Sequence, residues 1–390
     1  MITELSTPPA YSSAHDRAIF LVSSNNSTYD NFKFVFDIYV DSTKVATIKR
    51  WCIPGTSIGV LDVADIVRAY LSNIYFFPNV NVITNITSNG FFRKSFYIKY
   101  GEEMGTPPTA YLNMLTSATF WLYNYANDID KYPNYVQLSM YDGNWLTNNP
   151  KVISIDRSDK YYLSYFKTVG GSRTFSIKTY NEAGVLQSTH TQISANDLIQ
   201  LGVGCYQINN LWPGTINDTI SYYTIDDGVG NVVRFNIDAP CRYKQKHLVF
   251  LNRLGGYESA YFRGKSMRSM EIEKKTFGKN NYRVFGFDQY SAGYSLLETT
   301  GVPVSERQPS SVMKKYKQRL STDFLTDAEF TWLGELIASP AVYMEMSSSG
   351  FFVPVNITNS NYEFKTRSMD GINPIEIEVE FLNTFTSQLV

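Results

Sequence analysis

An alternating stretch near the start of the chain reads Phe34-Val35-Phe36-Asp37-Ile38-Tyr39-Val40. The even-numbered positions are all apolar, so in an extended chain they share one face, as in a half-buried β-strand. The residues that follow, Asp41-Ser42-Thr43-Lys44, are typical of a tight turn, and Val45-Ala46-Thr47-Ile48 has the composition of a returning strand. The stretch therefore predicts a β-hairpin and a β-rich start to the fold.

Short β-runs separated by turn residues recur along the rest of the chain. Examples are residues 96–100, 152–155, 175–180, 232–237, 246–251, 352–357 and 375–381. This spacing predicts a mainly β protein of tandem β-sandwich or barrel-like domains with one or two helices. We expect an N-terminal β domain with one helix at 1–125, a β-sandwich-like domain at 126–240, and a C-terminal β domain with one helix at 241–390.

Two segments have helical rather than strand periodicity. The first lies near 62–75, where apolar residues follow the spacing of an amphipathic face and Asp62 is a plausible cap. The second lies near 326–338, where Thr326 and Glu329 form a T-x-x-E capping box before a buried stripe of Phe330, Leu333, Leu336 and Ile337.

The composition describes the surface. Charged residues make up only 18% of the 390 residues and aromatic residues 15%, which is typical of β-proteins that meet other proteins over wide contacts. No apolar run approaches the length of a membrane span, and the N-terminus has no secretory pattern, so we expect a soluble protein. The three cysteines, Cys52, Cys205 and Cys241, are predicted to be free thiols.

The charges are unevenly distributed. Residues 242–319 hold 16 Lys and Arg against 6 Asp and Glu, a balance of +10, and residues 320–390 hold 2 against 10, a balance of −8. Each block is either a solvated face or half of a contact between a basic and an acidic surface. The last predicted strand alternates Ile and Val with Glu, and its carboxylates must face water or cations because burying them is costly.

These blocks supply the candidate interface for the next copy of the chain or a partner. Its basic members are Arg242, Lys244, Lys246, Lys314, Lys315, Lys317 and Arg319, and its acidic members are Glu376, Glu378 and Glu380. Nucleic acid is a less favoured partner for the same cations. Arg242, Lys244 and Lys246 alternate along a predicted strand and would share a face that tracks a phosphate backbone.

Catalytic and metal-binding patterns find little support. None of the standard hydrolase, zinc-protease or nucleotide-binding motifs is present, and we predict no catalytic residue, metal or cofactor. Cys241 and His247 share a face on a predicted strand, but two unrelated residues explain the spacing better than a two-ligand site. Asp226-Asp227-Gly228 is better explained as a hairpin tip than as a carboxylate pair for glycoside hydrolysis.

Glycan binding is the alternative to a purely structural role. Trp145 and Trp212 lie in polar, turn-rich surroundings, where exposed rings stack on sugars. The simpler hypothesis is that each tryptophan plugs the end of a β-sandwich.

Several segments resemble virion structural proteins of tailed bacteriophages that infect Bacteroidetes. They are Phe20-Leu21-Val22-Ser23-Ser24-Asn25, the stretch from Asn31 to Val40, Leu251-Asn252-Arg253-Leu254-Gly255-Gly256-Tyr257, the stretch from Leu325 to Leu333, Ser339-Pro340, and Pro354-Val355-Asn356-Ile357-Thr358. The resemblance implies a tail, neck or baseplate component, located in the virion and synthesised in the host bacterial cytoplasm. Such a protein assembles as a homo-oligomeric ring and contacts other virion proteins. A receptor- or glycan-binding fibre-type virion protein is the alternative.

Overall fold

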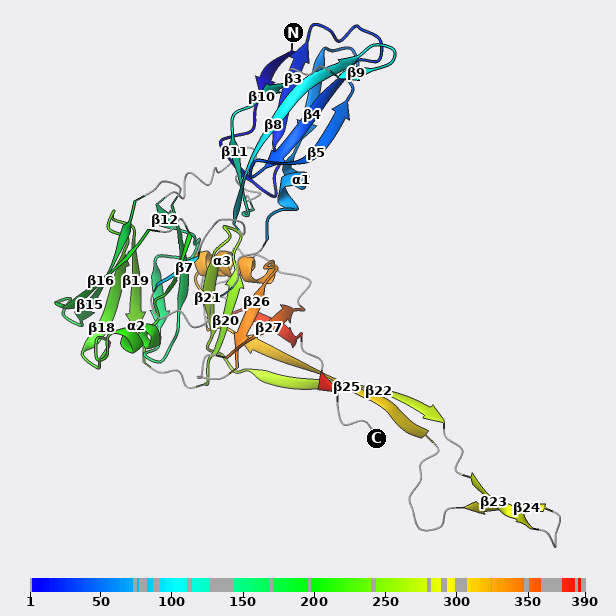
Figure 1. The fold of residues 1–390 in the computed structure, drawn as a ribbon. Helices are drawn as coiled ribbons and strands as arrows, with labels where there is room; N and C mark the ends of the chain where they lie inside the picture. The colour runs from blue at the N-terminus through cyan, green and yellow to red at the C-terminus, as the bar shows by residue number, and fades with distance from the viewer. Residues whose placement is uncertain are drawn as a thin grey trace.

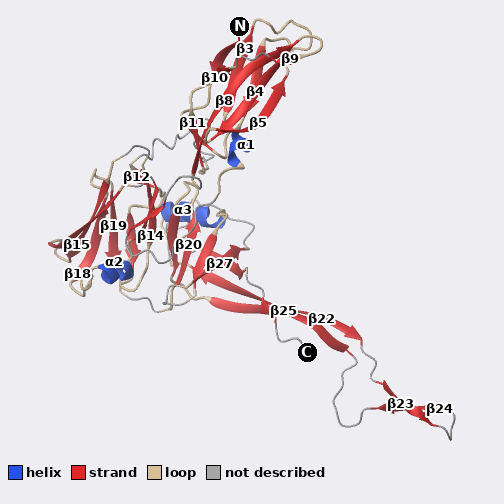
Figure 2. Ribbon diagram, in the orientation of Figure 1, coloured by secondary structure: helices blue, strands red, loops and turns tan. Residues whose placement is uncertain are grey.

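The computed structural model describes residues 2–72, 76, 83–86, 92–110, 114–126, 143–167, 171–195, 198–239, 243–278, 282–288, 293–298, 307–323, 325–346, 351–358, 374–382 and 385–386. Over these residues the chain is mainly β, as predicted, with several multi-stranded sheets and three short helices (Figures 1 and 2). No helix in this part of the chain is both long and apolar enough to cross a membrane.

The N-terminal part is a sandwich of two sheets. One has the order β1 (Ile2–Ser6), β3 (Ile19–Ser24), β6 (Ile58–Asp62), and the other has β2 (Tyr11–Ser13), β11 (Phe120–Tyr123), β8 (Arg93–Met104), β4 (Lys33–Val40), β5 (Thr43–Arg50), with β9 (Thr109–Ala110) and β10 (Leu115–Thr116) also on β8. The predicted hairpin is confirmed, since β4 and β5 pair through a turn whose residues Asp41 and Ser42 have positive φ. The even-numbered residues of β4 are buried between the sheets, as the alternation predicts.

The first predicted helix is shorter than expected. Helix α1 covers only Ala64–Arg68, and the amides of Tyr70 and Leu71 bond to carbonyls three residues back, which is a tighter turn than an α-helix. The buried stripe fails at Tyr70, which is 47% exposed. Asp62 lies one residue before the N-cap, and its Oδ1 accepts bonds from the amides of Ala64 and Ala18, so it ties the helix start to the neighbouring strand.

The middle part is also a two-sheet sandwich. Its five-stranded sheet has the order β13 (Val152–Ile155), β19 (Val232–Ile237), β18 (Ile220–Asp226), β15 (Arg173–Asn181), β16 (Leu186–Ser194), and its four-stranded sheet has β12 (Asn144–Trp145), β14 (Tyr162–Phe166), β17 (Leu198–Gly202), β7 (Ile83–Ile86). β7 therefore folds with the middle sandwich although it lies within residues 1–125. Asp226-Asp227 does lie at a hairpin, between β18 and β19. Helix α2 (Cys205–Leu211) was not predicted.

The C-terminal part is a curled eight-stranded sheet with one helix packed on it. Its order is β21 (Tyr257–Phe262), β20 (Lys246–Leu251), β26 (Val342–Glu345), β27 (Phe352–Ile357), β28 (Glu376–Phe381), β25 (Arg307–Ser321), β22 (Met267–Gly278), with β29 (Phe385–Thr386) on β25. A separate two-stranded unit, β23 (Tyr282–Asp288) and β24 (Gly293–Glu298), lies between β22 and β25 in the chain. Helix α3 (Asp327–Ile337) confirms the second helix prediction, with Thr326 and Glu329 forming the capping box.

One aromatic cluster joins the three parts. It contains Phe92 and Tyr123 from the first, Tyr162 from the middle, and Tyr257 from the last. The ring of Phe76 lies 5.0 to 5.4 Å from four aromatic rings, on β14, β21, β26 and β27. This shared core holds the middle sandwich against the C-terminal sheet.

Candidate functional site

A long two-stranded ribbon leaves the C-terminal sheet. β22 and β25 pair from Met267, opposite Arg319, to Gly278, opposite Arg307, a distance of about 40 Å at the usual rise per residue. Only the inner end of β25, Lys317–Ser321, also pairs with β28, and β29 pairs only at Met313 and Lys314. We call β22 together with residues 307–316 the arm. It projects away from the body of the protein (Figure 1).

The arm carries apolar side chains that the other described residues of the chain leave exposed. Every residue of β22 is exposed, including Met267 (62%), Met270 (48%), Ile272 (44%) and Phe277 (48%). A two-stranded ribbon without a packed face is only marginally stable in water, and exposed apolar groups along such a ribbon mark an interaction surface.

The predicted basic and acidic blocks meet within the chain. On β25 and β28, Lys317 lies opposite Glu380 and Arg319 opposite Glu378. Lys317 Nζ is also 3.3 Å from a carboxylate oxygen of Glu271 on β22, and Glu271 is the main cause of the raised pKa of Lys317. Glu376, opposite Ser321, is exposed. Lys317 and Arg319 thus have acidic neighbours in their own subunit.

The last strand alternates as predicted. Ile377, Val379 and Phe381 are buried, while Glu378 and Glu380 are half-buried beside the cations of β25. Lys314 and Lys315 lie further along the arm, opposite Ile272 and Glu271. Of the predicted interface residues, these two are the ones placed on the arm itself.

The basic strand expected at 242–246 is not formed as predicted. β20 begins at Lys246, so Lys244 precedes the strand, and Arg242 lies outside the described residues. Lys244 and Lys246 therefore do not share a strand face that could follow a nucleic-acid backbone. Lys246 instead lines a hollow at the base of the arm, together with Arg268 of β22.

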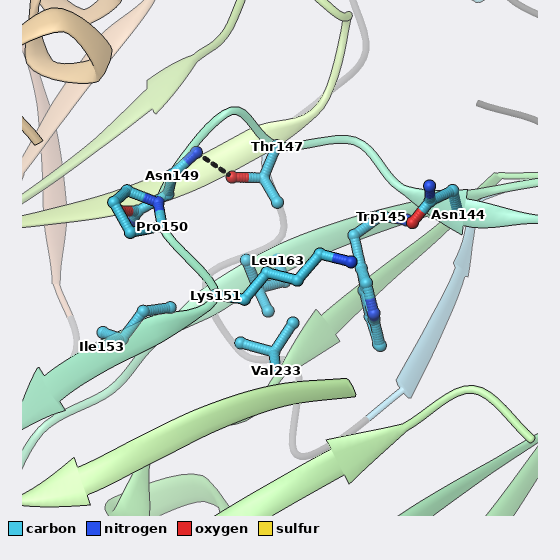
Figure 3. A pocket seen from close by; sticks show the side chains of 9 residues that line it. All are labelled: Asn144, Trp145, Thr147, Asn149, Pro150, Lys151, Ile153, Leu163 and Val233. Carbon is cyan, nitrogen blue, oxygen red and sulfur yellow. Dashed lines mark hydrogen bonds between the residues drawn. The ribbon is translucent and has the colours of Figure 1, made fainter. Parts of the chain in front are cut away.

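The tryptophans do not form an exposed glycan platform. Trp145 is 2% exposed, its Nε1 donates to the Asn231 carbonyl at 3.0 Å, and its ring packs on Tyr165 and Phe175. The simpler hypothesis is therefore confirmed for Trp145, whose ring plugs the middle sandwich, and the alternative of an exposed sugar-stacking ring does not hold there. The cavity beside it (Figure 3) has a volume of about 70 Å³, far below that of a ligand pocket. Trp212 is half-buried and stacks on His190 at 4.6 Å.

A buried polar chain lies where the middle sandwich meets the C-terminal sheet. His247 Nδ1 is 2.9 Å from Glu345 Oε2, His247 Nε2 is 2.9 Å from Ser259 Oγ, and Lys160 Nζ donates to Glu345 Oε1 at 2.7 Å. Burial lowers the pKa of His247, which favours the neutral ring. The order carboxylate, imidazole, hydroxyl is that of a hydrolase triad, but Ser259 itself is 0% exposed.

These buried hydrogen bonds also bear on the hypothesis that Cys241 and His247 form a two-ligand metal site. Both ring nitrogens of His247 are already in contact with Glu345 and Ser259, and Cys241 lies outside the described residues. No group of three or more potential metal ligands occurs in the part of the chain that the structure describes. Of the other cysteines, Cys52 is a half-buried free thiol and Cys205 a buried one, as predicted.

Two buried carboxylates were missed by the sequence reasoning. Burial raises the pKa of Glu258 from 4.5 to about 7, and it raises the pKa of Asp159 from 3.8 to about 7. Glu258 Oε2 accepts bonds from Asn252 Nδ2 at 2.9 Å and from Trp332 Nε1 at 3.1 Å. A signal was present, since Glu258 is the lone acid in the otherwise uncharged strand Tyr257–Phe262.

Comparison with known proteins adds no relative. No protein-family model matches the sequence, and a search of curated proteins finds no significant match.

Proposed function

We propose that this chain is a non-enzymatic structural component of a tailed-phage virion, a tail, neck or baseplate protein whose copies assemble through the arm. The phage origin rests on the resemblance of the sequence segments quoted above. The assembly role rests on one observation, the ribbon of β22 and β25, whose apolar side chains on β22 are exposed among the residues that the structure describes.

The size of the apolar surface indicates how such an assembly is held together. Four side chains on β22 are about half exposed, and covering them is worth roughly 4 kcal/mol in total. Association costs at least about as much in lost translational and rotational freedom. One arm is therefore a weak contact, and stable assembly requires each copy to make several contacts at once, as in a closed ring.

Light scattering on the purified full chain tests the proposal. We expect the wild-type protein to form a discrete oligomer. For the triple variant Met270→Ser, Ile272→Ser, Phe277→Ser, the concentration below which the oligomer dissociates should be at least tenfold higher than for wild type. The matched control is Leu186→Ser with Ile193→Ser, because these side chains are 51% and 67% exposed on β16, away from the arm. Wild-type protein that stays monomeric at all concentrations, or an arm variant that assembles like wild type, contradicts self-assembly through the arm.

The glycan-binding alternative loses its main support. Trp145 is buried, and Trp212 is half-buried against His190. No other observation on the described residues favours this alternative.

A further inference from the structure

A hollow of about 250 Å³ lies at the base of the arm. It is lined by residues of β20, β22, β25, β26 and β28 and of the segments before β22 and after β26, namely Lys246, Ser266, Arg268, Gln318, Met344, Glu345, Met346 and Phe381. Lys246 and Arg268 belong to strands five places apart in the sheet order, so the hollow forms where the sheet curls on itself.

Positive charge in this hollow exceeds the available negative charge. Over the described residues, neither Lys246, Lys244 nor Arg268 forms an ion pair with a carboxylate. The pKa of Lys246 is lowered, first by burial and then by the nearby charges of Lys244 and Arg268. Several positive charges close together in a hollow favour the binding of an anion, because the anion reduces the repulsion between them.

The one acid in the lining does not neutralise these cations. Glu345 Oε1 accepts from Lys160 at 2.7 Å, and Glu345 Oε2 lies 2.9 Å from His247 Nδ1. Burial opposes ionisation of Glu345, but the bonds from His247 and Lys160 outweigh it and lower its pKa. The negative charge of Glu345 is therefore balanced by Lys160, which comes from the middle sandwich, and not by Lys246 or Arg268.

Arg268 is also held in position for recognition. The central carbon of its guanidinium lies 4.5 Å from the ring centroid of Tyr316 and 5.9 Å from that of Phe381. A guanidinium fixed over aromatic faces keeps its N–H edge for bidentate bonds to a planar or tetrahedral oxyanion. Ser266 and the buried Gln318 add neutral donors to the same hollow.

We propose that this hollow is a binding site for a small oxyanion, a phosphate or carboxylate group held by Lys246 and the stacked Arg268. This inference does not depend on the assembly role of the arm, since it concerns the free subunit. The volume suits one such group rather than a large ligand.

The test is competitive amine labelling of the full chain. Lys246 has a lowered pKa, so its amine reacts faster with acetic anhydride than that of an ordinary lysine. A bound oxyanion should slow this reaction. We expect 10 mM inorganic phosphate at low ionic strength to slow labelling of Lys246 at least threefold while labelling of the exposed Lys151 is unchanged. Equal labelling of Lys246 with and without phosphate or glutamate overturns the proposal.

Variants separate a built site from general electrostatics. In a ³¹P NMR titration with phosphate, Arg268→Gln should weaken binding at least tenfold, Arg268→Lys should weaken it by a smaller factor, and the control Lys151→Gln should leave it unchanged. Thermal melting checks that each variant is folded. If Lys151→Gln weakens binding as much as Arg268→Gln, the site is refuted.

Parallel labelling experiments with phosphate and with glutamate distinguish a phosphate ligand from a carboxylate ligand. Protection of Lys246 by phosphate but not by glutamate identifies a phosphate ligand, protection by glutamate but not by phosphate identifies a carboxylate ligand, and equal protection by both identifies a site that accepts either oxyanion. Each of these results supports the site.

Discussion

The buried carboxylate of Glu258 makes the stability of this fold depend on pH. Glu258 is 0% exposed, and burial, reinforced by the nearby Glu335, raises its pKa from 4.5 to about 7, against the opposing bonds from Thr147, Asn252 and Trp332. Between these two pH values the folded protein holds a proton that the unfolded chain has released. The free energy of unfolding therefore falls as the pH rises from about 4.5 to about 7, and it is constant with respect to this group above that range.

The size of the effect follows from the shift. Each pKa unit corresponds to 1.36 kcal/mol, so the loss approaches roughly 3 kcal/mol by pH 8. The variant Glu258→Gln removes the titration but keeps an oxygen that accepts from Asn252 and Trp332. We expect the variant to match or fall below wild type at pH 5 and to exceed it by about 1–3 kcal/mol at pH 8.

Urea unfolding followed by tryptophan fluorescence at pH 5, 6, 7 and 8 measures this difference. Asp159, whose pKa is also raised to about 7, titrates in both proteins and cancels when the two curves are subtracted. Parallel stability curves for wild type and Glu258→Gln across the four pH values would refute the reasoning.

Three further predictions concern packing, capping and assembly. Trp145→Ala should destabilise the middle sandwich by about 3–5 kcal/mol in urea unfolding, since the ring is buried, and a loss below 1 kcal/mol would contradict this. Thr326→Ala should cost about 1 kcal/mol through the lost cap of α3, and Thr326→Ser, which keeps the hydroxyl, is the control. Lys314→Glu with Lys315→Glu should change the oligomer mass in light scattering and its salt dependence without a change in melting temperature, because both lie on the arm. Lys317→Glu should instead lower the melting temperature, because its carboxylate neighbours are in the same subunit.

The fold class could be predicted from the strands in which burial of one face makes apolar and polar residues alternate along the sequence. The alternation in β28 is visible because one face of the strand is buried and the other is not. In β4 the even-numbered side chains lie in the hydrophobic core, whereas Val35 and Asp37 are buried outside that core. The capping box of α3 is equally local, so Thr326 and Glu329 identify the helix start without knowledge of the rest of the fold. For α1 the apolar spacing continues beyond the helix, and only the packing of the N-terminal sandwich shows that the turn at Tyr70 ends it.

The arm could not be predicted in the same way. β22 is exposed on both faces, so burial imposes no alternation, and residues 265–275 show only that the stretch is basic and contains methionine. The placement of β7 in the middle sandwich and the presence of Lys246 and Arg268 in one hollow both depend on long-range topology. Glu258 and Asp159 acquire their raised pKa values from burial by distant segments, which a local pattern does not contain.

Because β25 runs without interruption from the arm into the C-terminal sheet, the arm has no hinge at its base. Five consecutive residues, Lys317–Ser321, are paired with β28, and Leu320 among them is fully buried. A force that pulls on the arm along its length therefore shears the backbone hydrogen bonds between β25 and β28. In shear these bonds resist the force together, whereas a perpendicular force would break them one at a time. Tension on β25 therefore passes directly into the hydrophobic core of the body, through Leu320 and its paired neighbours.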